Sequence, residues 1–433
     1  MTTGRRVGAW GRLSADEHAW RPLDDRSQVP AAIAAGAGLA FGNGRSYGDV
    51  CLNPGGILWG MRGLDRFIDF DADAGIVECE AGVLLKDIID LALPRGWFPP
   101  VVPGTQFVTV GGAIANDVHG KSHQAAGSFG EHVLSFELVR TTGEVLQCSP
   151  DGNGAWFAAT VGGLGLTGVI TRARLRLRRV AGGWLDAETI PFESLESFFD
   201  LSARARQGCE YSVAWIDCLG GGRGRGVFFQ GNHADSTQPV PQRRPRTVPL
   251  TPPMSLVNAG SLRLFNFAYY RLNRLRRGKY RQHYVPFFFP LDHVLQWNRI
   301  YGPRGFYQYQ CVVPRAVELD ATRALLQEIG RAGLGSFLAV LKTFGDRPPP
   351  GLLSFPMPGT TLALDFPNRG LPTLRLFDRL NAVVQEAGGR LYCAKDACMP
   401  PQLLGTGYPR LPEFLRHRDP GISSALSRRL LGS

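Results

Sequence analysis

The chain has 433 residues, of which 44% are hydrophobic and 20% are charged, so it is long enough for two domains and has the composition of a soluble globular protein. Its net charge of +11 favours an anionic partner, such as a nucleic acid, an acidic lipid, a nucleotide cofactor or a phosphorylated substrate. The eight cysteines include no C-x-x-C pair, so neither a metal site nor a disulfide scaffold is expected. The first residues lack the apolar core of a signal peptide, and no apolar run is long enough to cross a bilayer, so we expect a cytoplasmic protein.

The first part of the chain alternates short strands with short helices. Helices are predicted where apolar residues recur at helical spacing, and strands where apolar and polar residues alternate between turn residues. The predicted elements are a helix over 28–37, strands over 38–41 and 57–59, a hairpin of 67–70 with 76–80, a helix over 84–93, and a hairpin of 133–140 with 145–148. Small β units with helices between them are typical of an α+β fold with a mixed sheet.

Residues 42–49 form a Gly-rich segment, Gly-Asn-Gly-Arg-Ser-Tyr-Gly-Asp. The Rossmann dinucleotide motif requires G-x-G-x-x-G at the beginning of a helix, but here the third glycine comes one residue late and residues 51–56 cannot begin a helix. Residues 159–170 do contain G-x-G-x-x-G, but they lead into a strand over 170–178 with one basic face. Both segments therefore predict turns of phosphate-binding size in a fold other than Rossmann.

A third Gly-rich stretch, 103–130, is the centre of the predicted site. Glycine lets a ligand lie against bare backbone amides, and the first amides of a helix beginning near Val110 are expected to face a phosphate. The alternative interpretation is a tight loop before a buried helix. The residues on which the binding interpretation depends are Gly104, Thr105, Thr109, Gly111, Gly112 and Gly120, with His-Gly-Lys at 119–121.

From about residue 184 the composition becomes aromatic, Arg-rich and Pro-rich, which predicts a second domain. We predict domains over 1–183, completed by 390–433, and over 184–389. The predicted elements here are a surface loop over 238–253, helices over 317–332 and 371–387, strands over 337–341, 361–366 and 391–395, and a basic helical tail. The basic aromatic stretch 261–289 is either a solvated helix flank or a docking surface for a lipid or lipid phosphate.

The segments 42–49, 103–130, 159–170 and 391–396 together resemble the flavoenzymes of the vanillyl-alcohol oxidase type, and the resemblance covers nearly the whole chain. Further matches in the same order lie at 297–303, 308–310, 354–356 and 365–367. The resemblance implies a two-domain α+β flavoprotein, with an FAD-binding domain of the PCMH type and a substrate domain built on an antiparallel sheet with flanking helices.

The resemblance also implies roles for individual residues. Those expected to contact FAD are Asn43, Gly44, Arg45, Ser46, Tyr47, Gly48, Pro103, Gly104, Thr105, Thr109, Gly111, Gly112, Asn116, Gly120, Gly165, Ile170, Tyr392 and Lys395. Those expected to contact the substrate are Lys121, Tyr301, Gln308, Gln310, Lys342 and Phe344, and the catalytic residues are Lys395, His119 and Tyr47. Relatives with covalent flavin carry a histidine in the turn at 44–46, where this chain has Gly-Arg-Ser, so noncovalent FAD is implied.

The activity implied is oxidation of a sugar hydroxyl to a ketone by hydride transfer to flavin. Within the family, the resemblance favours the 2'-hydroxyl of a polyprenyl-phosphate pentose, oxidised as the first half of an epimerisation in cell-envelope biosynthesis. It then implies an NAD(P)H-dependent reductase partner and peripheral contact with the inner face of the membrane. One alternative is an oxidase of free alditols or aldonolactones. The other is a basic nucleic-acid-binding protein, which is disfavoured because no helix-turn-helix, zinc or RNA-binding signature is present.

Lys395 is expected to point at the flavin. The chain uses lysine only at Lys86, Lys121, Lys279, Lys342 and Lys395, amid abundant arginine. A retained lysine indicates a need for a compact ammonium or a tunable pKa, although Lys86 and Lys279 are taken as chance. On the predicted strand 391–395, Lys395 faces away from Tyr392 and Ala394.

Overall fold

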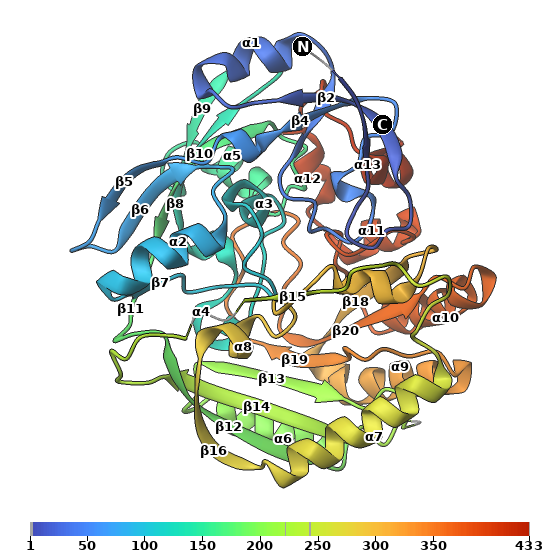
Figure 1. Ribbon diagram of the computed structural model, residues 1–433. Coiled ribbons are helices and arrows are strands. Elements are labelled where there is room, and N and C mark those ends of the chain that lie inside the picture. The colour runs from blue at the N-terminus through green and yellow to red at the C-terminus, as the bar shows by residue number, and fades with distance from the viewer. Residues whose placement is uncertain (1–2, 221, 242–243, 433) are drawn as a thin grey trace.

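The computed structural model describes residues 3–220, 222–241 and 244–432. In Figure 1, residues 3–180 and the C-terminal helices occupy the upper part of the molecule, and the residues between them occupy the lower part. Both chain ends therefore lie in the upper part (Figure 1). The assignment of two domains and their boundaries stays a prediction.

Four short strands form a mixed sheet near the N-terminus. They are β1 (Thr3–Val7), β2 (Asp16–Pro22), β3 (Gly38–Phe41) and β4 (Ile57–Gly60), with α1 (Val29–Ala34) between β2 and β3. The strand order is β1-β2-β4-β3; β1 pairs antiparallel with β2, and β4 is parallel to both of its neighbours. Because β3 ends at Phe41, this sheet holds the beginning of the Gly-rich segment 42–49 in place.

A second, antiparallel sheet confirms both predicted hairpins. Its strands, in the order β5-β6-β10-β8-β9, are β5 (Phe67–Asp71), β6 (Ile76–Glu80), β10 (Val169–Arg176), β8 (Val133–Val139) and β9 (Val145–Cys148). Along the chain, α2 (Leu85–Ala92), α3 (Val110–Ala115) and α4 (His123–Ala126) lie between β6 and β8, and α5 (Gly154–Thr160) lies between β9 and β10. Side chains of α2, α3 and α5 share one apolar core with β6, β8 and β10, which fixes the Gly-rich beginning of α3.

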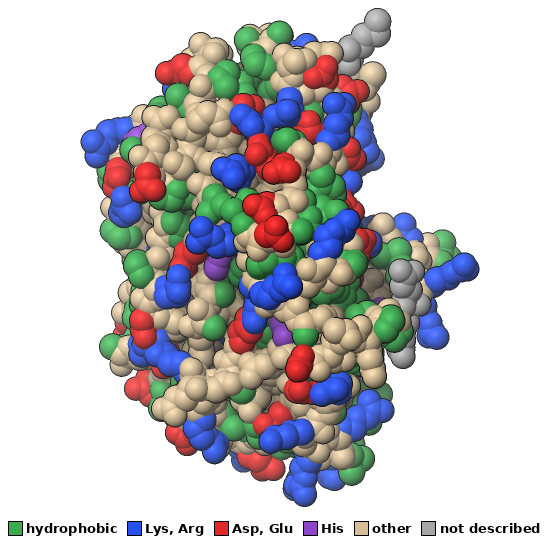
Figure 2. Space-filling model, turned by 90° about the vertical axis from the view of Figure 1, so that its left-hand side faces the viewer, with side chains coloured by type: hydrophobic (Ala, Val, Ile, Leu, Met, Phe, Trp, Pro, Cys, Tyr) green, Lys and Arg blue, Asp and Glu red, His purple; other side chains and the backbone are tan. Residues whose placement is uncertain are grey.

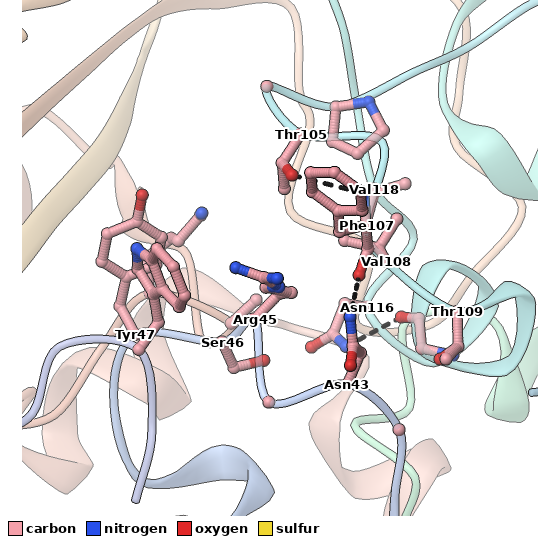
Figure 3. Close-up of a pocket in the computed structure, with 18 of the residues that line it drawn as sticks. Asn43, Arg45, Ser46, Tyr47, Thr105, Phe107, Val108, Thr109, Asn116 and Val118 are labelled. Carbon is pink, nitrogen blue, oxygen red and sulfur yellow. Dashed lines mark hydrogen bonds between the residues drawn. The ribbon is translucent and has the colours of Figure 1, made fainter. Parts of the chain in front are cut away.

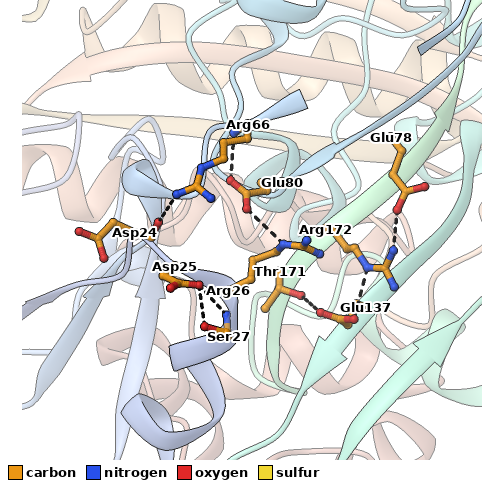
Figure 4. A network of polar contacts seen from close by, with 10 residues as sticks. All are labelled: Asp24, Asp25, Arg26, Ser27, Arg66, Glu78, Glu80, Glu137, Thr171 and Arg172. Atoms are coloured by element: carbon orange, nitrogen blue, oxygen red, sulfur yellow. Dashed lines mark hydrogen bonds and ion pairs between the residues drawn. The ribbon is translucent and has the colours of Figure 1, made fainter. Parts of the chain in front are cut away.

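Arg172, on the predicted basic face of strand 170–178, pairs with acidic residues of the neighbouring strands. Arg172 pairs with Glu78 of β6 at 2.6 Å and with Glu137 of β8 at 3.3 Å (Figure 4). Glu80 is 2% exposed and accepts hydrogen bonds from the Arg26 side chain at 3.1 Å and the Arg66 amide at 3.0 Å. These contacts join strands to each other and to the first sheet region, so Arg172 of this face has a structural role.

The lower part of the molecule is built on an eight-stranded antiparallel sheet of order β16-β12-β14-β13-β19-β20-β18-β21. Its strands are β12 (Trp184–Phe192), β13 (Tyr211–Ile216), β14 (Gly226–His233), β16 (Gly278–His283), β18 (Phe306–Pro314), β19 (Val340–Phe344), β20 (Gly359–Pro367) and β21 (Arg390–Leu391). Its helices are α6 (Leu195–Ala205), α7 (Ala259–Leu275), α8 (Tyr284–Phe288), α9 (Glu318–Ala332) and α10 (Leu371–Glu386).

Helices pack on both faces of this sheet. Ala214 and Phe228 share a core with Phe198 of α6 and with α9 and α10. Their neighbours Trp215 and Val227 point to the other face and pack against Tyr270 of α7. Alternation along β13 and β14 therefore places α6 and α7 on opposite faces of the sheet.

Three predicted elements are corrected. The strand expected at 337–341 runs instead from Val340 to Phe344, because Ser336 and Leu338 are held by a local side-chain turn. The strand expected at 391–395 ends at Leu391, and residues 393–395 form a turn. The loop expected at 238–253 contains β15 (Arg246–Thr247), which pairs in parallel with β17 (Val294–Leu295); residues 242–243 lie outside the described chain.

The C-terminal helices fasten the Gly-rich segments to the rest of the fold. They are α11 (Pro401–Gly407), α12 (Leu411–Leu415) and α13 (Ala425–Leu431). Arg429 of α13 binds Asp49 through Nε at 2.9 Å and Asp396 through Nη2 at 2.8 Å. One half-buried guanidinium thus joins the end of segment 42–49 to the turn that carries Lys395.

Within the described residues, no helix is both long and apolar enough to cross a bilayer. On the face shown in Figure 2, basic and acidic side chains are interspersed.

Candidate active site

A cavity of about 570 Å³ lies between the Gly-rich segments and the eight-stranded sheet (Figure 3). Strands β13, β18, β19 and β20 contribute side chains to one wall, and the segment 288–297 contributes another. The predicted site residues that line it are Asn43, Gly44, Arg45, Ser46, Tyr47, Pro103, Gly104, Thr105, Thr109, Gly111, Gly112, Asn116, His119, Gly120, Lys121, Gly165, Ile170, Gln308, Gln310, Lys342, Tyr392 and Lys395. Segments that are far apart in the sequence thus converge on one cavity.

Three predicted residues do not line the cavity. Gly48 packs against the turn that carries Lys395, where an added Cβ would lie 1.5 Å from the Asp396 carbonyl oxygen. Tyr301 is buried, and its ring stacks on Phe306 with the centroids 4.1 Å apart. Phe344 is also buried and lies behind His119, with ring centroids 5.0 Å apart. These three residues support the site from behind.

Two loops present unpaired backbone amides at the cavity. Among the described residues, the amides of 43–46 and of 104–105 donate no hydrogen bond to the protein. The side chain of Asn43 donates to the Phe107 carbonyl at 2.7 Å and so holds the two loops together (Figure 3). Gly44 has a φ of +59°, which a larger residue rarely adopts. Clustered free amides of this kind bind anions such as a pyrophosphate.

The expectation that the first amides of the helix at Val110 face a phosphate is wrong. Val110 donates to the Val83 carbonyl at 2.9 Å and Gly111 donates to the Ala81 carbonyl at 2.8 Å. Gly112 donates to the hydroxyl of Thr109, which is the N-cap of α3. The protein itself therefore satisfies these donors, and the loop amides at 43–46 and 104–105 are the available ones.

Two buried polar atoms in the cavity wall have no protein partner, namely Arg45 Nε and Asn116 Oδ1. The Arg45 guanidinium lies 4.3 Å from the ring centroid of Trp10 and 5.4 Å from that of Phe107. Burial lowers the pKa of Arg45, and the charge of Asp292 opposes this shift. Because buried polar groups are almost always hydrogen-bonded, these atoms indicate that a polar ligand completes the wall. Trp10 and Asp292 carried no motif that could have identified them in the sequence, whereas Phe107 lies in the stretch 103–130 but was assigned no role.

Three lysines from three segments meet at the cavity, where Lys342 is buried and Lys121 and Lys395 are half-buried. Burial lowers the pKa of Lys121 to about 7, that of Lys342 to about 7 and that of Lys395 to about 8. Among the described residues, no carboxylate lies within ion-pair distance of any of the three. Lys121 instead donates to the Phe287 carbonyl, and Lys342 donates to the Gly120 carbonyl at 2.6 Å. A cluster of unmatched ammonium groups favours an anionic ligand.

His119 is held by hydrogen-bonding groups at both ring nitrogens. Lys342 Nζ lies 3.0 Å from Nδ1, and Gln310 Nε2 lies 3.0 Å from Nε2. Burial, followed by the charge of Lys342, lowers the pKa of His119 well below its usual value, so the ring is neutral. A neutral imidazole accepts at only one nitrogen, so only one of the two partners donates to it. The arrangement fixes Lys342 and Gln310 relative to each other.

Lys395 reaches the cavity for a different reason from the one predicted. Because the chain turns at 393–395, Tyr392, Ala394 and Lys395 all line the cavity, and the strand alternation that separated them is wrong. Lys395 Nζ lies 3.9 Å above the centre of the Tyr47 ring. The turn is fixed by a hydrogen bond from the Tyr47 amide to the Ala394 carbonyl at 3.3 Å. Tyr47 and Lys395 are therefore positioned together.

Asp365 is a charged residue beside this pair to which the sequence assigned no role. It is fully buried, and its Oδ1 accepts a hydrogen bond from Gln308 at 2.7 Å, whereas its Oδ2 has no partner. Burial raises the pKa of Asp365 to about 7, and the positive charge of Lys395 opposes the shift. The motif Asp-Phe-Pro at 365–367 was visible, but only the fold brings Asp365 close enough to Lys395 for their charges to interact.

The geometry of the site fits a cofactor that carries a pyrophosphate, because free backbone amides and lysine side chains lie in one large cavity. A family model described as an FAD binding domain matches residues 31–149. Decaprenylphosphoryl-β-D-ribose oxidase of Mycolicibacterium smegmatis is 37% identical over 99% of this chain and 98% of its own length. The chain belongs to the same family of FAD-dependent oxidoreductases as that enzyme.

Two further relatives define how far the similarity extends. An uncharacterized protein of Streptomyces coelicolor is 35% identical over 80% of this chain and 100% of its own length. Cytokinin dehydrogenase 10 of Oryza sativa is 36% identical, but only over 31% of this chain and 26% of its own length.

Proposed function

We propose that the protein oxidises the 2'-hydroxyl of a polyprenyl-phosphate pentose to a ketone, as the first half of an epimerisation. The M. smegmatis relative is, by its name, an oxidase of a decaprenylphosphoryl ribose, and its similarity extends over almost the whole of both chains. An NAD(P)H-dependent reductase partner would then reduce the ketone to the epimeric alcohol.

The observation that carries the proposal is the set of cations formed by Lys121, Lys342 and Lys395, none of which has a described carboxylate within ion-pair distance. All three line the cavity beside Gln308 and Gln310, and their burial is costly unless an anion is bound. The free amides at 43–46 and 104–105 are available for the pyrophosphate of FAD, which leaves the lysines for a second anion. A phosphate ester supplies that anion, whereas a free alditol or aldonolactone is neutral.

The residues divide the chemistry as follows. When bound, FAD supplies the acceptor for the hydride that leaves the carbinol carbon, and the hydroxyl proton leaves to a base as the C=O bond forms. Burial raises the pKa of Tyr47 well above its usual value, so its phenol stays protonated and cannot be that base. Both nitrogens of His119 are occupied by Lys342 and Gln310, so His119 positions these two groups. Lys395 remains as the group that orients the hydroxyl and stabilises negative charge.

An anaerobic flavin-reduction assay tests the proposed substrate. We expect a short-chain polyprenyl-phosphate ribose to bleach the flavin absorbance, and a free alditol or aldonolactone at the same concentration to leave it unchanged. The reverse result would establish the alditol or aldonolactone activity and overturn the proposal. Neutral polyprenyl ribosides without phosphate serve as the control for recognition of the phosphate.

We further propose that FAD is held without a covalent bond, because residues 44–46 contain no histidine. Acid precipitation should then leave the flavin in the supernatant, and a precipitate that retains the flavin would contradict this. The same treatment provides apoprotein for binding measurements.

Gly104→Ala should weaken FAD binding without disturbing the fold. Gly104 lines the cavity, and a Cβ built there meets no protein atom within 4 Å, so any effect must come from the ligand. We expect the Kd for FAD, measured by titration of apoprotein, to rise about tenfold, which corresponds to about 1.4 kcal/mol. Gly208→Ala is the matched control, because a Cβ there also meets nothing within 4 Å but Gly208 lies outside the cavity. An unchanged Kd would show that FAD does not approach the 103–105 loop.

A further inference from the structure

Helix α7 presents an apolar stripe to solvent. Its inner face is held to the sheet by Leu262, Asn266 and Tyr270, which are buried. On the outer face Leu264 is 70% exposed and Leu275 is 84% exposed. Phe267 and Leu272 are exposed beside them, at spacings that place the four side chains on one side of the helix. Scattered single apolar residues are normal on a protein surface, but a stripe along one helix marks an interaction site.

The surroundings of the stripe are strongly basic. Residues 236–291 contain nine arginines, one lysine and no aspartate or glutamate, and so carry ten of the eleven net positive charges of the chain. Among the described residues, Arg263, Arg271, Arg276 and Arg277 take part in no ion pair. Of the arginines nearby, Arg274 lies 3.9 Å from Glu193, and Arg281 pairs with Asp186 at 2.8 Å. Most of the positive charge on α7 is therefore free to meet an external anion.

Exposed apolar residues continue from α7 toward the cavity. Leu250 is 77% exposed and Met254 is 70% exposed on the segment that precedes the helix. This segment is tied to the cavity rim, because Arg299 donates to the carbonyls of Val248 and Pro249 at 2.8 and 2.7 Å. Just before it, β15 pairs with β17, whose Val294 and Leu295 line the cavity.

We propose that the outer face of α7, with the segment 248–256, docks the protein onto an anionic phospholipid bilayer. Leucine and phenylalanine side chains enter the headgroup region while the flanking arginines contact lipid phosphates. A second copy of this chain fits this face less well than a bilayer does, because face-to-face contact would bring two arginine-rich stripes together and their charges would repel. Docking places the cavity rim beside the bilayer, so a lipid-linked sugar can enter without leaving the membrane; this last step alone rests on the proposed function.

Flotation of the FAD-loaded protein with vesicles tests the docking surface. We expect binding to phosphatidylcholine vesicles that contain about 30% phosphatidylglycerol, and little binding to pure phosphatidylcholine. The combined variant R263Q/R271Q/R276Q/R277Q should bind at least about tenfold more weakly, because each arginine near an anionic surface contributes to binding. The variant L264S/F267S/L275S, which keeps every charge, should also lose binding. The charge-matched control R95Q/R204Q/R375Q/R416Q removes four exposed arginines outside α7 and should bind as the parent does.

The outcomes separate this proposal from its competitors. A parent that does not float, or α7 variants that float as well as the parent, would overturn it. If the parent protein forms dimers through α7 in sedimentation experiments and does not bind vesicles, this face is a contact between two copies of the chain. Failure of the proposed function can be distinguished from failure of the docking proposal, because flotation requires no substrate. Conversely, in detergent a short-chain lipid phosphate should bleach the flavin absorbance of the α7 variants at the parental rate.

Discussion

Lys395→Met should retain FAD and the native fold while its flavin is reduced roughly a hundredfold more slowly, because losing a charge-assisted contact made mainly in the transition state costs about 3 kcal/mol. Lys395 is half-buried beside Tyr47 and close to Asp365, so methionine can fill the space without the charge. The measurement is anaerobic stopped flow with a polyprenyl-phosphate pentose, together with the visible spectrum of the purified variant to establish FAD content.

The exposed lysine of the Lys86–Asp90 pair provides the control, and Lys86→Met should react at the parental rate. If Lys395→Met also reacts at the parental rate, Lys395 is not part of the chemistry. If the variant is purified without flavin, Lys395 binds cofactor and does not act on the substrate. An ammonium role also predicts that the rate for the parent falls as pH rises through about 8, the pKa of Lys395, whereas a rise would assign it as the base.

Lys121→Met should stabilise the apoprotein at a pH near 6.5 and stabilise it much less at a pH near 9.5. Burial lowers the pKa of Lys121 to about 7, whereas an unfolded lysine titrates near pH 10.4. Between these values the unfolded state binds more protons, so the parent gains stability as pH rises, and the penalty is complete only below about pH 7. A tenfold difference in proton affinity between the folded and unfolded states corresponds to about 1.4 kcal/mol, so the advantage of methionine at the lower pH should be several kcal/mol.

The midpoint of thermal unfolding of apoprotein, measured at both pH values, checks this expectation. Lys279→Met, at an exposed position of β16, should show no difference between the two pH values. An equal gain for Lys121→Met at both pH values would mean that packing, and not titration, is responsible. A lower unfolding midpoint for Lys121→Met at both pH values would mean that the hydrogen bond to the Phe287 carbonyl outweighs the cost of burying the charge.

Local structure could be predicted wherever it depends on neighbours in the chain. The hairpin formed by β5 and β6 followed from alternating apolar residues around an Asp-rich turn, and helix α2 followed from apolar spacing that stops before Pro94. The cavity loops at 43–46 and 103–105 could also be recognised, because glycine and polar residues at a chain reversal are required locally for close approach of a ligand.

Positions near the ends of elements were predicted less well. The amides at the beginning of α3 are used by Ala81, Val83 and Thr109, and the first two of these acceptors lie on a distant part of the chain. The strand expected at 391–395 stops at Leu391, because Asp396 is held by Arg429 of α13 and by the amides of Cys398 and Met399. Such long-range partners override local alternation, and the side of the chain on which Lys395 lies changes with them.

The sequence by itself determined the kinds of residue available: glycine-rich loops, an excess of positive charge, and a few lysines among many arginines. Only the tertiary structure decided that Lys121, Lys342 and Lys395 share one cavity in which no described carboxylate lies within ion-pair distance of them, since they come from a loop, a strand and a turn. The same holds for α7, whose apolar stripe faces outward because Leu262 and Tyr270 face the sheet. The cost of burying a charge and the choice of exposed face both depend on what surrounds a side chain, and that is set by packing between distant segments.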